Sequence, residues 1–334
     1  MPSKNTRRNR HLRPFGRFCC ALLVLLGCLS SVGSAEWQEE IGYDRLAAML
    51  GEALPDGAGV PISLVEAQAT NSEQGSPKYF PDTTHSQFGS VLDPGGMAVT
   101  FVDGSGGQSN GNSGHAFDQA RTFFGNTFSV APSANAVTIY EANDYLTDIL
   151  NLNNSNLDAP DVQDFRVQNF SWIGSFATPN DGTPEPTTSE LNNDRESLRR
   201  FDFLIDRDNV TAVVGLNNGT GVLPNLLSHS YNAIAVGRSD GNHSTGLTHF
   251  ADYGVGRSKP ELVSPQPSTS LATSSVSSVA TFLHSSDTVA GTDAVQSQTM
   301  KAILLAGATK DTLPSWSQLD GTGTWHPLDD TYGA

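Results

Sequence analysis

The sequence predicts an α/β protein with a doubly wound, mainly parallel sheet flanked by helices. Two observations lead to this fold class. Short runs rich in valine and isoleucine recur without strict alternation, as expected for strands that are covered on both faces. Helical patterns separate these runs, and this order indicates strand–helix–strand units in one sheet. In such a sheet, functional residues gather in loops at the carboxyl ends of the strands.

The expected elements follow in chain order. The strands are predicted at 60–67, 97–102, 136–140, 166–173, 209–215 and 232–237. The helices are predicted at 115–124, 144–150, 189–206, 270–283 and 297–305. About 300 of the residues follow position 35, which is enough for one large domain with a well-buried core.

Residues 1–35 resemble an export signal. A basic head without acidic residues precedes an apolar segment at 18–29, which is too short to span a bilayer comfortably. A small-residue cleavage site follows at 33–35, so we expect the domain to cover 36–334 and the protein to be exported, to the extracellular or periplasmic space. A second interpretation is lipoprotein processing of the box Leu-Leu-Gly-Cys, which would leave a lipidated Cys28.

Removal of the first 35 residues would take away all three cysteines, Cys19, Cys20 and Cys28. The domain would then contain no disulfide, cysteine nucleophile or thiolate metal site. The loss of six basic residues would also change the formal net charge from −16 to −22. Such an acidic surface argues against nucleic acid or an anionic membrane as a partner. We expect no membrane span in the mature chain, and a monomer.

Thr269-Ser270 stands between a proline-containing turn and a run of small and apolar residues that predicts a buried helix. Ser270 would lie in its first turn, where free backbone N–H groups and the positive end of the helix dipole favour a developing anion. A serine placed there can act as a nucleophile, because the oxyanion formed by its attack lies close to these donors. The alternative is that Ser and Thr simply cap the helix.

The region around this serine resembles a known family. Residues 259–273 (KPELVSPQPSTSLAT) are similar to "KPDIVAPG" and "GTSMATP" of the subtilisin-like serine peptidases (subtilases), with Ser270 at the position of the nucleophile. Residues 209–219 (NVTAVVGLNNG) and the following SYNAIAVG resemble the family's "VVVVAAAGNDG" and "YPNVIAVGA". Asn217 then matches the amide that donates to the oxyanion, an interaction worth ~3 kcal/mol in subtilisin.

A histidine and an acid extend the resemblance, which covers roughly residues 57–310. His115 opens HAFDQARTFFG, and the following SVAPSANAVTIY matches the family's "GVAPSAxLYAVKV", so His115 corresponds to the general base. The segment GVPISLVEA resembles "GVKVAVIDSG" and places Glu66 where the family has aspartate. A carboxylate there accepts from the histidine Nδ1–H and stabilises the imidazolium. Asp103 and Asp118 are the other candidates for this acid.

The resemblance also implies a substrate cleft. VQNFSWIG at 167–174 is similar to the family's "VINMSLG" strand, whose edge pairs with substrate backbone, although an ordinary core strand explains it equally. Leu216 replaces a family glycine and adds bulk where the primary specificity pocket should open. Calcium is common in the family, but no ligand loop is recognisable, so no metal or other cofactor is predicted. The expected lining residues are Ser171, Trp172, Ile173, Gly174, Gly215 and Leu216.

Three functions are compatible with these patterns. The first is an exported serine endopeptidase that hydrolyses peptide bonds through Ser/His/acid acyl-enzyme catalysis, with a protein or peptide substrate. The second is a catalytically inactive subtilase-fold protein that binds peptides or a partner, because substitutions surround all four motifs. The third is an unrelated α/β hydrolase or binding protein, although the sequence has no Gly-x-Ser-x-Gly elbow. Residues 331–334 resemble the start of the family's closing element, and one interpretation is that the domain is truncated there.

Overall fold

A computed structural model describes most of the chain in ten segments. Residues Trp37–Ala334 form one compact unit, and the fold below is that of this unit. The predicted export signal at 1–35 lies outside the described residues and stays a prediction. No helix in the described segments is long and apolar enough to cross a membrane. These segments are 36–69, 78–89, 98–107, 111–152, 158–176, 188–248, 256–286, 292–313, 315–319 and 323–334.

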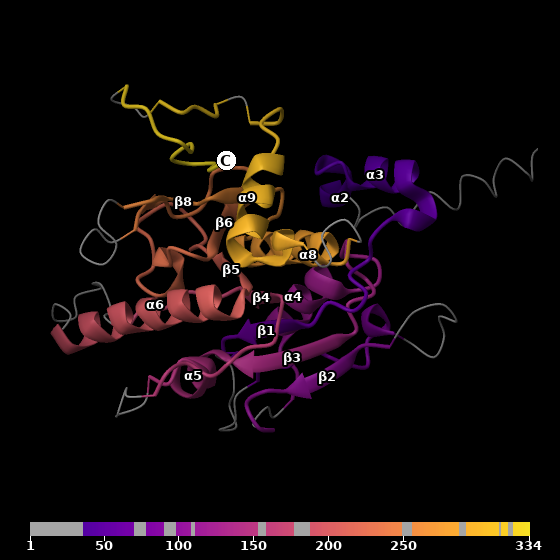
Figure 1. The fold of residues 1–334 in the computed structure, drawn as a ribbon, viewed down its shortest axis with the longest axis horizontal. Helices are drawn as coiled ribbons and strands as arrows, with labels where there is room; N and C mark the ends of the chain where they lie inside the picture. The colour runs from indigo at the N-terminus through magenta and orange to yellow at the C-terminus, as the bar shows by residue number, and fades with distance from the viewer. Residues whose placement is uncertain are drawn as a thin grey trace, which may run out of the picture. The chain divides into compact units, whose positions relative to one another are not determined.

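Seven of the described strands form one sheet in the order β2-β3-β1-β4-β5-β6-β9 (Figure 1). Each neighbouring pair in this sheet is parallel, as the sequence predicts. A short antiparallel pair, β7–β8, forms a separate ladder. The strand bounds are β1 Ile62–Glu66, β2 Thr100–Asp103, β3 Ala136–Glu141, β4 Val167–Phe170, β5 Thr211–Gly215, β6 Ile234–Arg238, β7 Gly246–Leu247, β8 Ser258–Lys259 and β9 Leu262–Ser264.

The five predicted helical segments are present, and two short helices precede the first strand. The segment predicted as a helix at 144–150 is one short α-helical piece that continues as a π-helical turn at Tyr145–Ile149. The α-helix bounds are α2 Glu36–Glu40, α3 Tyr43–Leu50, α4 Gly114–Phe124, α5 Ala142–Asp144, α6 Thr188–Asp208, α8 Thr269–His284 and α9 Ser297–Gly307.

Both faces of the sheet are covered by helices. Successive side chains of a strand point to opposite faces, so each strand contributes to two cores. On β5, Val213 packs into a core cluster shared with α4, α8 and α9. Its neighbours Ala212 and Val214 pack into a second cluster, which contains Phe201 and Leu204 of α6. This arrangement explains the continuous apolar runs in the sequence and confirms the predicted doubly wound α/β class.

Helix α8 packs across the middle of the sheet. It contacts β4, β5, β6 and β9, and it also packs against α4. Its sequence is rich in serine and threonine, yet Thr273, Ser274 and Ser277 are fully buried. The hydroxyls of Thr273 and Ser277 donate to the carbonyl oxygens four residues earlier, at 2.8 and 3.0 Å, which satisfies them inside the helix.

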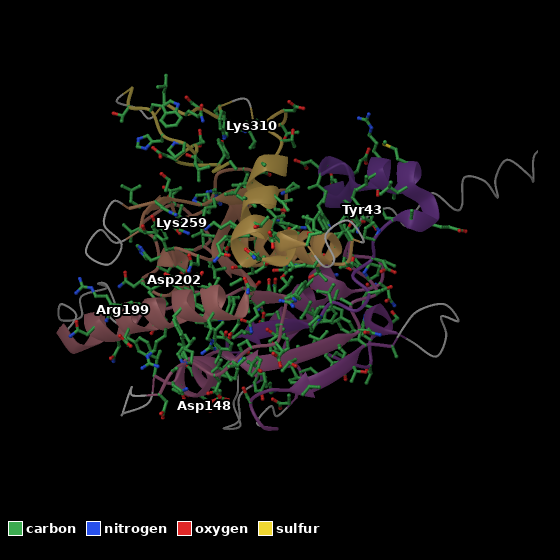
Figure 2. All side chains as sticks on the ribbon, viewed as in Figure 1. Tyr43, Asp148, Arg199, Asp202, Lys259 and Lys310 are labelled. Atoms are coloured by element: carbon green, nitrogen blue, oxygen red, sulfur yellow. The ribbon has the colours of Figure 1, made fainter. Side chains whose placement is uncertain are left out.

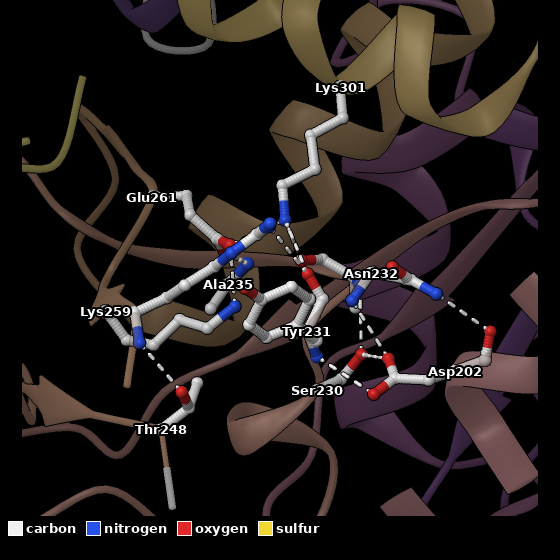
Figure 3. A network of polar contacts seen from close by, with 11 residues as sticks. Asp202, Ser230, Tyr231, Asn232, Ala235, Thr248, Lys259, Glu261 and Lys301 are labelled. Carbon is white, nitrogen blue, oxygen red and sulfur yellow. Dashed lines mark hydrogen bonds and ion pairs between the residues drawn. The ribbon is translucent and has the colours of Figure 1, made fainter. Parts of the chain in front are cut away.

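A buried charge cluster anchors β9, which leads into α8 (Figure 3). One of its members, Lys259, is labelled among all the side chains in Figure 2. The ammonium groups of Lys259 and Lys301 both donate to Glu261 Oε1, at 2.7 and 2.6 Å. Glu261 Oε2 accepts from the backbone N–H of Ala235 on β6, at 2.7 Å. The cluster therefore holds two cations against one carboxylate, and burial lowers the pKa of Lys259 to about 8.

We expect Lys259→Met to stabilise the protein at neutral pH. The lysine pKa is lower in the folded state (about 8) than in an unfolded chain (~10.4). Below pH 8 the ammonium is charged in both states, so the full free-energy cost of burying this charge opposes folding. That cost fades as the pH rises and is absent above about pH 10.4. The gain in unfolding free energy should reach up to about 3 kcal/mol at pH 7. Chemical denaturation at pH 7 and pH 10 measures it.

Lys301→Met is the matched control for this prediction. Lys301 Nζ also donates to the carbonyl oxygens of Tyr231 and Ala233, at 3.2 and 2.8 Å, so its removal leaves two carbonyls without this donor and should destabilise the protein. An equal effect of Lys259→Met at both pH values would contradict the explanation by buried charge.

Candidate active site

Glu66 occupies the last position of β1, at the carboxyl edge of the sheet. Its side chain is fully buried, and Oε2 lies 2.6 Å from Nδ1 of His115. Among the described residues, its second oxygen Oε1 is buried and has no hydrogen-bond partner. Burial raises the pKa of Glu66, while the hydrogen bond and the charge of His115 lower it in part. The strand thus delivers a desolvated carboxylate to one nitrogen of the imidazole.

His115 lies in the first turn of α4. The helix begins there because the Ser113 hydroxyl caps it, accepting from the backbone N–H of Ala116 at 3.2 Å. The imidazole is 46% exposed, so one edge of it remains accessible. Burial alone would lower its pKa, but the hydrogen bond and charge of Glu66, with a contribution from Asp118, raise it above the ordinary value. A carboxylate that accepts from Nδ1–H leaves Nε2 as the basic nitrogen.

Ser270 lies in the first turn of α8, as the sequence predicts. Ser268 caps this helix, and its hydroxyl accepts from the backbone N–H of Leu271 at 3.2 Å. The Ser270 Oγ donates to the carbonyl oxygen of Ser171 at 3.2 Å, and Ser171 Oγ donates to the carbonyl oxygen of Ser270 at 2.9 Å. No hydrogen bond joins Ser270 to His115 in the described part of the chain, although their helices pack together.

Asn217 follows β5 and is exposed. Its backbone is held by Ser244, whose Oγ accepts from the Asn217 N–H at 3.1 Å. The next residue, Asn218, was not singled out by sequence. Its Oδ1 accepts from both the backbone N–H and the hydroxyl of Thr269, at 2.9 and 3.1 Å. Asn218 therefore ties the loop that carries Asn217 to the residue directly before Ser270.

The other predicted lining residues have diverse surroundings. Ile173 is 43% exposed, while Leu216 is only 2% exposed and packs into the cluster beneath α6. The Gly174 carbonyl oxygen accepts from the backbone N–H of Leu226 at 3.0 Å. Trp172 packs against the same cluster as Leu216. A Cβ on Gly215 would lie 3.2 Å from Thr273 Oγ1, so α8 passes close to the end of β5.

The two alternative acids are engaged elsewhere. Asp103 accepts from the hydroxyl of Tyr79 at 2.7 Å, and Asp118 pairs with Arg121 at 3.0 Å. Glu66 is thus the acid in direct contact with His115. Within the described residues, no three His, Cys, Asp or Glu side chains gather as a metal-binding group.

Gln119 joins the two helices and was also missed by sequence. It stands four residues after His115, and Ser274 stands four residues after Ser270, so each lies one turn below on the same helix face. Gln119 Oε1 accepts from Ser274 Oγ at 2.8 Å, and its Nε2 lies 3.4 Å from His115 Nε2. These two spacings of four residues are the only sequence feature that could have pointed to Gln119. The sequence does not show that the two helices face each other.

An apolar cavity lies away from this site. It has a volume of about 360 Å³ and is lined by residues of α2, α3, α8 and α9, among them Trp37, Tyr43 and Phe282. None of the candidate site residues lines it.

The fold is similar to those of solved proteases. A lanthipeptide protease is 12% identical, with 90% of this chain and 92% of that chain covered and a TM-score of 0.53. A cold-adapted subtilisin-like serine proteinase is 15% identical, with 84% and 91% covered and a TM-score of 0.48. The prenylagaramide maturation protease is 17% identical, with 79% and 88% covered and a TM-score of 0.48. No family model and no curated protein matches the sequence.

At these identities the similarity concerns the fold alone. The seven-stranded parallel sheet, with helices on both faces, and the likeness over nine tenths of the chain to the lanthipeptide protease show that this chain has the same fold as that protease. The roles of the individual site residues stay predictions.

We expect the pKa of His115 to lie above the ordinary histidine value in the wild-type protein and below that value in Glu66→Gln. The variant removes the charge and acceptor that favour the imidazolium, and leaves the burial that opposes it. A raised histidine pKa stabilises the fold below the unfolded value of ~6.5, and this contribution is lost as the pH rises through the folded value. Nitrogen-15 NMR of labelled histidines measures the titration.

His243 is the internal control in the same spectra. Burial lowers its pKa, and its two ring nitrogens bond the Arg238 N–H and the Thr331 carbonyl oxygen, away from Glu66. Its titration should stay below the ordinary value in both proteins. A His115 pKa that does not respond to Glu66→Gln would show that the contact does not control this imidazole.

Proposed function

We propose that this protein is an exported serine endopeptidase that acts on peptides or proteins. The observation that carries the proposal is the 2.6 Å contact between the buried Glu66 carboxylate and His115 Nδ1 at the carboxyl edge of the sheet. Ser270, in the first turn of the helix packed against α4, is the proposed nucleophile. Export rests on the predicted signal at 1–35, and peptide substrates are suggested by the protease folds that this chain resembles.

The proposed reaction starts with release of the Ser270 hydroxyl from the Ser171 carbonyl oxygen. Its Oγ then attacks the substrate carbonyl carbon while His115 Nε2 takes the proton. Glu66 accepts from Nδ1–H and stabilises the imidazolium. The Asn217 side-chain amide and the Ser270 backbone N–H hold the oxyanion. His115 returns the proton to the leaving amine, and water releases the acyl group by the reverse sequence.

The resting contacts also support a second candidate, a subtilisin-like protein that binds peptides without cleaving them. The specific observation is that Ser270 Oγ donates to Ser171 and not to His115. Reaction with a serine-directed phosphonate separates the two functions, because the label requires an activated nucleophile.

A fluorophosphonate is expected to label the wild-type protein but not Ser270→Ala. Glu66→Gln should slow labelling by ~10²–10⁴-fold, because the uncharged amide neither fixes the tautomer nor stabilises the imidazolium. Glu66→Asp should retain part of the activity, since aspartate keeps the negative charge and is only one methylene group shorter. Mass spectrometry of the labelled peptide measures the rate. A folded wild-type protein that binds peptides and takes no label would support the binding function and refute catalysis.

Asn217→Ala tests the oxyanion donor separately. The amide bonds the oxyanion mainly in the transition state, so peptide hydrolysis should lose ~10²–10³ in kcat with little change in KM. Asn218→Ala is the matched comparison. It removes the acceptor for Thr269 and should lower stability and shift the position of α8. If Asn217→Ala raises KM and leaves kcat unchanged, this amide acts in substrate binding only.

A further inference from the structure

Gln119 holds the side of the His115 ring that Glu66 leaves free. Its side chain is 2% exposed and its hydrogen-bonding atoms point to two partners, His115 on its own helix and Ser274 on α8. Glu66 accepts from Nδ1–H, so the neutral ring presents a lone pair at Nε2, and the Gln119 amide N–H donates to it over 3.4 Å. The reactive nitrogen thus has a partner from the protein in the resting site.

The hydroxyls around Gln119 permit a second arrangement of the same atoms. Ser274 Oγ also lies 3.2 Å from Ser171 Oγ, and either atom can be the donor. Ser171 Oγ accepts from Asn169 Nδ2 at 2.8 Å and donates to the Ser270 carbonyl oxygen at 2.9 Å, which leaves it one acceptor site. If the Gln119 amide turns over, its N–H donates to Ser274, and the Ser274 hydroxyl donates to Ser171.

This second arrangement suits the imidazolium. With the amide turned over, Gln119 Oε1 faces His115 Nε2 and accepts from its N–H. Each protonation state of His115 is therefore matched by one orientation of the amide, with no hydrogen-bonding group lost in the network of Gln119, Ser274 and Ser171. An apolar side chain at 119 could match neither state.

We propose that Gln119 is a positioning residue for His115, and that Ser274 lets its amide turn over when His115 gains or loses a proton. This proposal rests on the proposed function only in giving His115 the role of a base. Gln119 acts on the imidazole and not on the substrate. The long contacts of the resting site, 3.4 Å for Gln119–His115 and 3.2 Å for Ser270–Ser171, are readily exchanged for a contact between Ser270 and His115.

The charges near His115 come from few elements. Glu66 reaches it from β1, and Asp118, paired with Arg121, lies on its own helix. His85 precedes the short helix at Ser86–Phe88 that packs on α4, and its ring contacts Phe117. The described residues that α8 and β4 bring to Gln119 and Ser270 are uncharged: Asn169, Ser171, Ser274 and Ser277. A charge introduced at position 119 will thus act on His115 with little competition from this side.

The test measures the His115 titration by nitrogen-15 NMR in a Ser270→Ala background, where no reaction occurs. Gln119→Glu is expected to raise the His115 pKa by about 1, because a fixed anionic acceptor faces Nε2. Gln119→Met has a similar shape and removes both donor and acceptor, so the nitrogen-15 resonance of Nε2 should shift in the neutral ring. Ser274→Ala should shift the same resonance by a smaller amount, since the amide loses its alignment.

Gln168→Met is the matched control. Gln168 is also a buried amide, but it accepts from Tyr145 at 2.9 Å beside the other core cluster, so its loss should reduce stability without moving the His115 signals. In the Ser270 protein, Gln119→Met is expected to slow phosphonate labelling by roughly 10- to 100-fold, because the base is misplaced.

Two results would overturn the proposal. One is a His115 titration and Nε2 resonance that stay at their wild-type values in Gln119→Glu, Gln119→Met and Ser274→Ala, whatever happens to stability. The other is an equal shift in Gln168→Met. Absence of label on the wild-type protein, with the NMR shifts as expected, would instead refute the peptidase function and retain Gln119 as the residue that positions the imidazole.

Discussion

A helix composed largely of serine and threonine can be buried only if its hydroxyl groups find partners, and this requirement governs the centre of the molecule. Some hydroxyls of α8 return to carbonyl oxygens of their own helix, as Thr281 does to Ser277. Others bind neighbouring elements: Ser278 accepts from the Val130 N–H, and Ser274 donates to Gln119 on α4. These directional bonds fix the rotation and height of α8 more closely than apolar packing alone would.

The same constraint positions the site. Ser270 has little freedom because α8 is bonded within one turn of it to Ser171, directly after β4, and to α4, and because Asn218 holds the residue before it. His115 is fixed differently, by a buried carboxylate at the end of a strand whose residues are all buried. Ser270 is thus placed by a network of neutral hydroxyls and His115 by a desolvated charge, and the two supports meet at Gln119.

Much of the fold was predictable because β1, β5 and β6 are almost entirely buried and therefore consist mainly of apolar residues. Strand β9 was not predicted, since three residues are too short to show a pattern. Helices α2 and α3 were missed because they are only five and eight residues long, too short to show a clear helical period. Trp37 of α2 and Tyr43 of α3 both pack against Phe282 of α8.

The candidate site was predictable where residues stand next to the ends of strands and helices. Glu66, His115 and Ser270 each lie in the local position expected from the sequence. Gln119 and Asn218 were not found, because their roles depend on contacts between elements that are far apart in the chain. Neither residue type is unusual in its local sequence, so only the packing of α4 on α8, and of the loop after β5 on Thr269, gives them a partner.

The Gln119–Ser274 hydrogen bond has an evolutionary consequence. Each side chain is buried and satisfies the other, so an apolar residue at one position would leave a polar group without its partner at the other, at a cost of about 1–3 kcal/mol. Replacement of both by apolar residues of suitable volume would avoid that cost. The two positions, 155 residues apart in sequence, should therefore covary among relatives of this chain, as polar pairs or as apolar pairs.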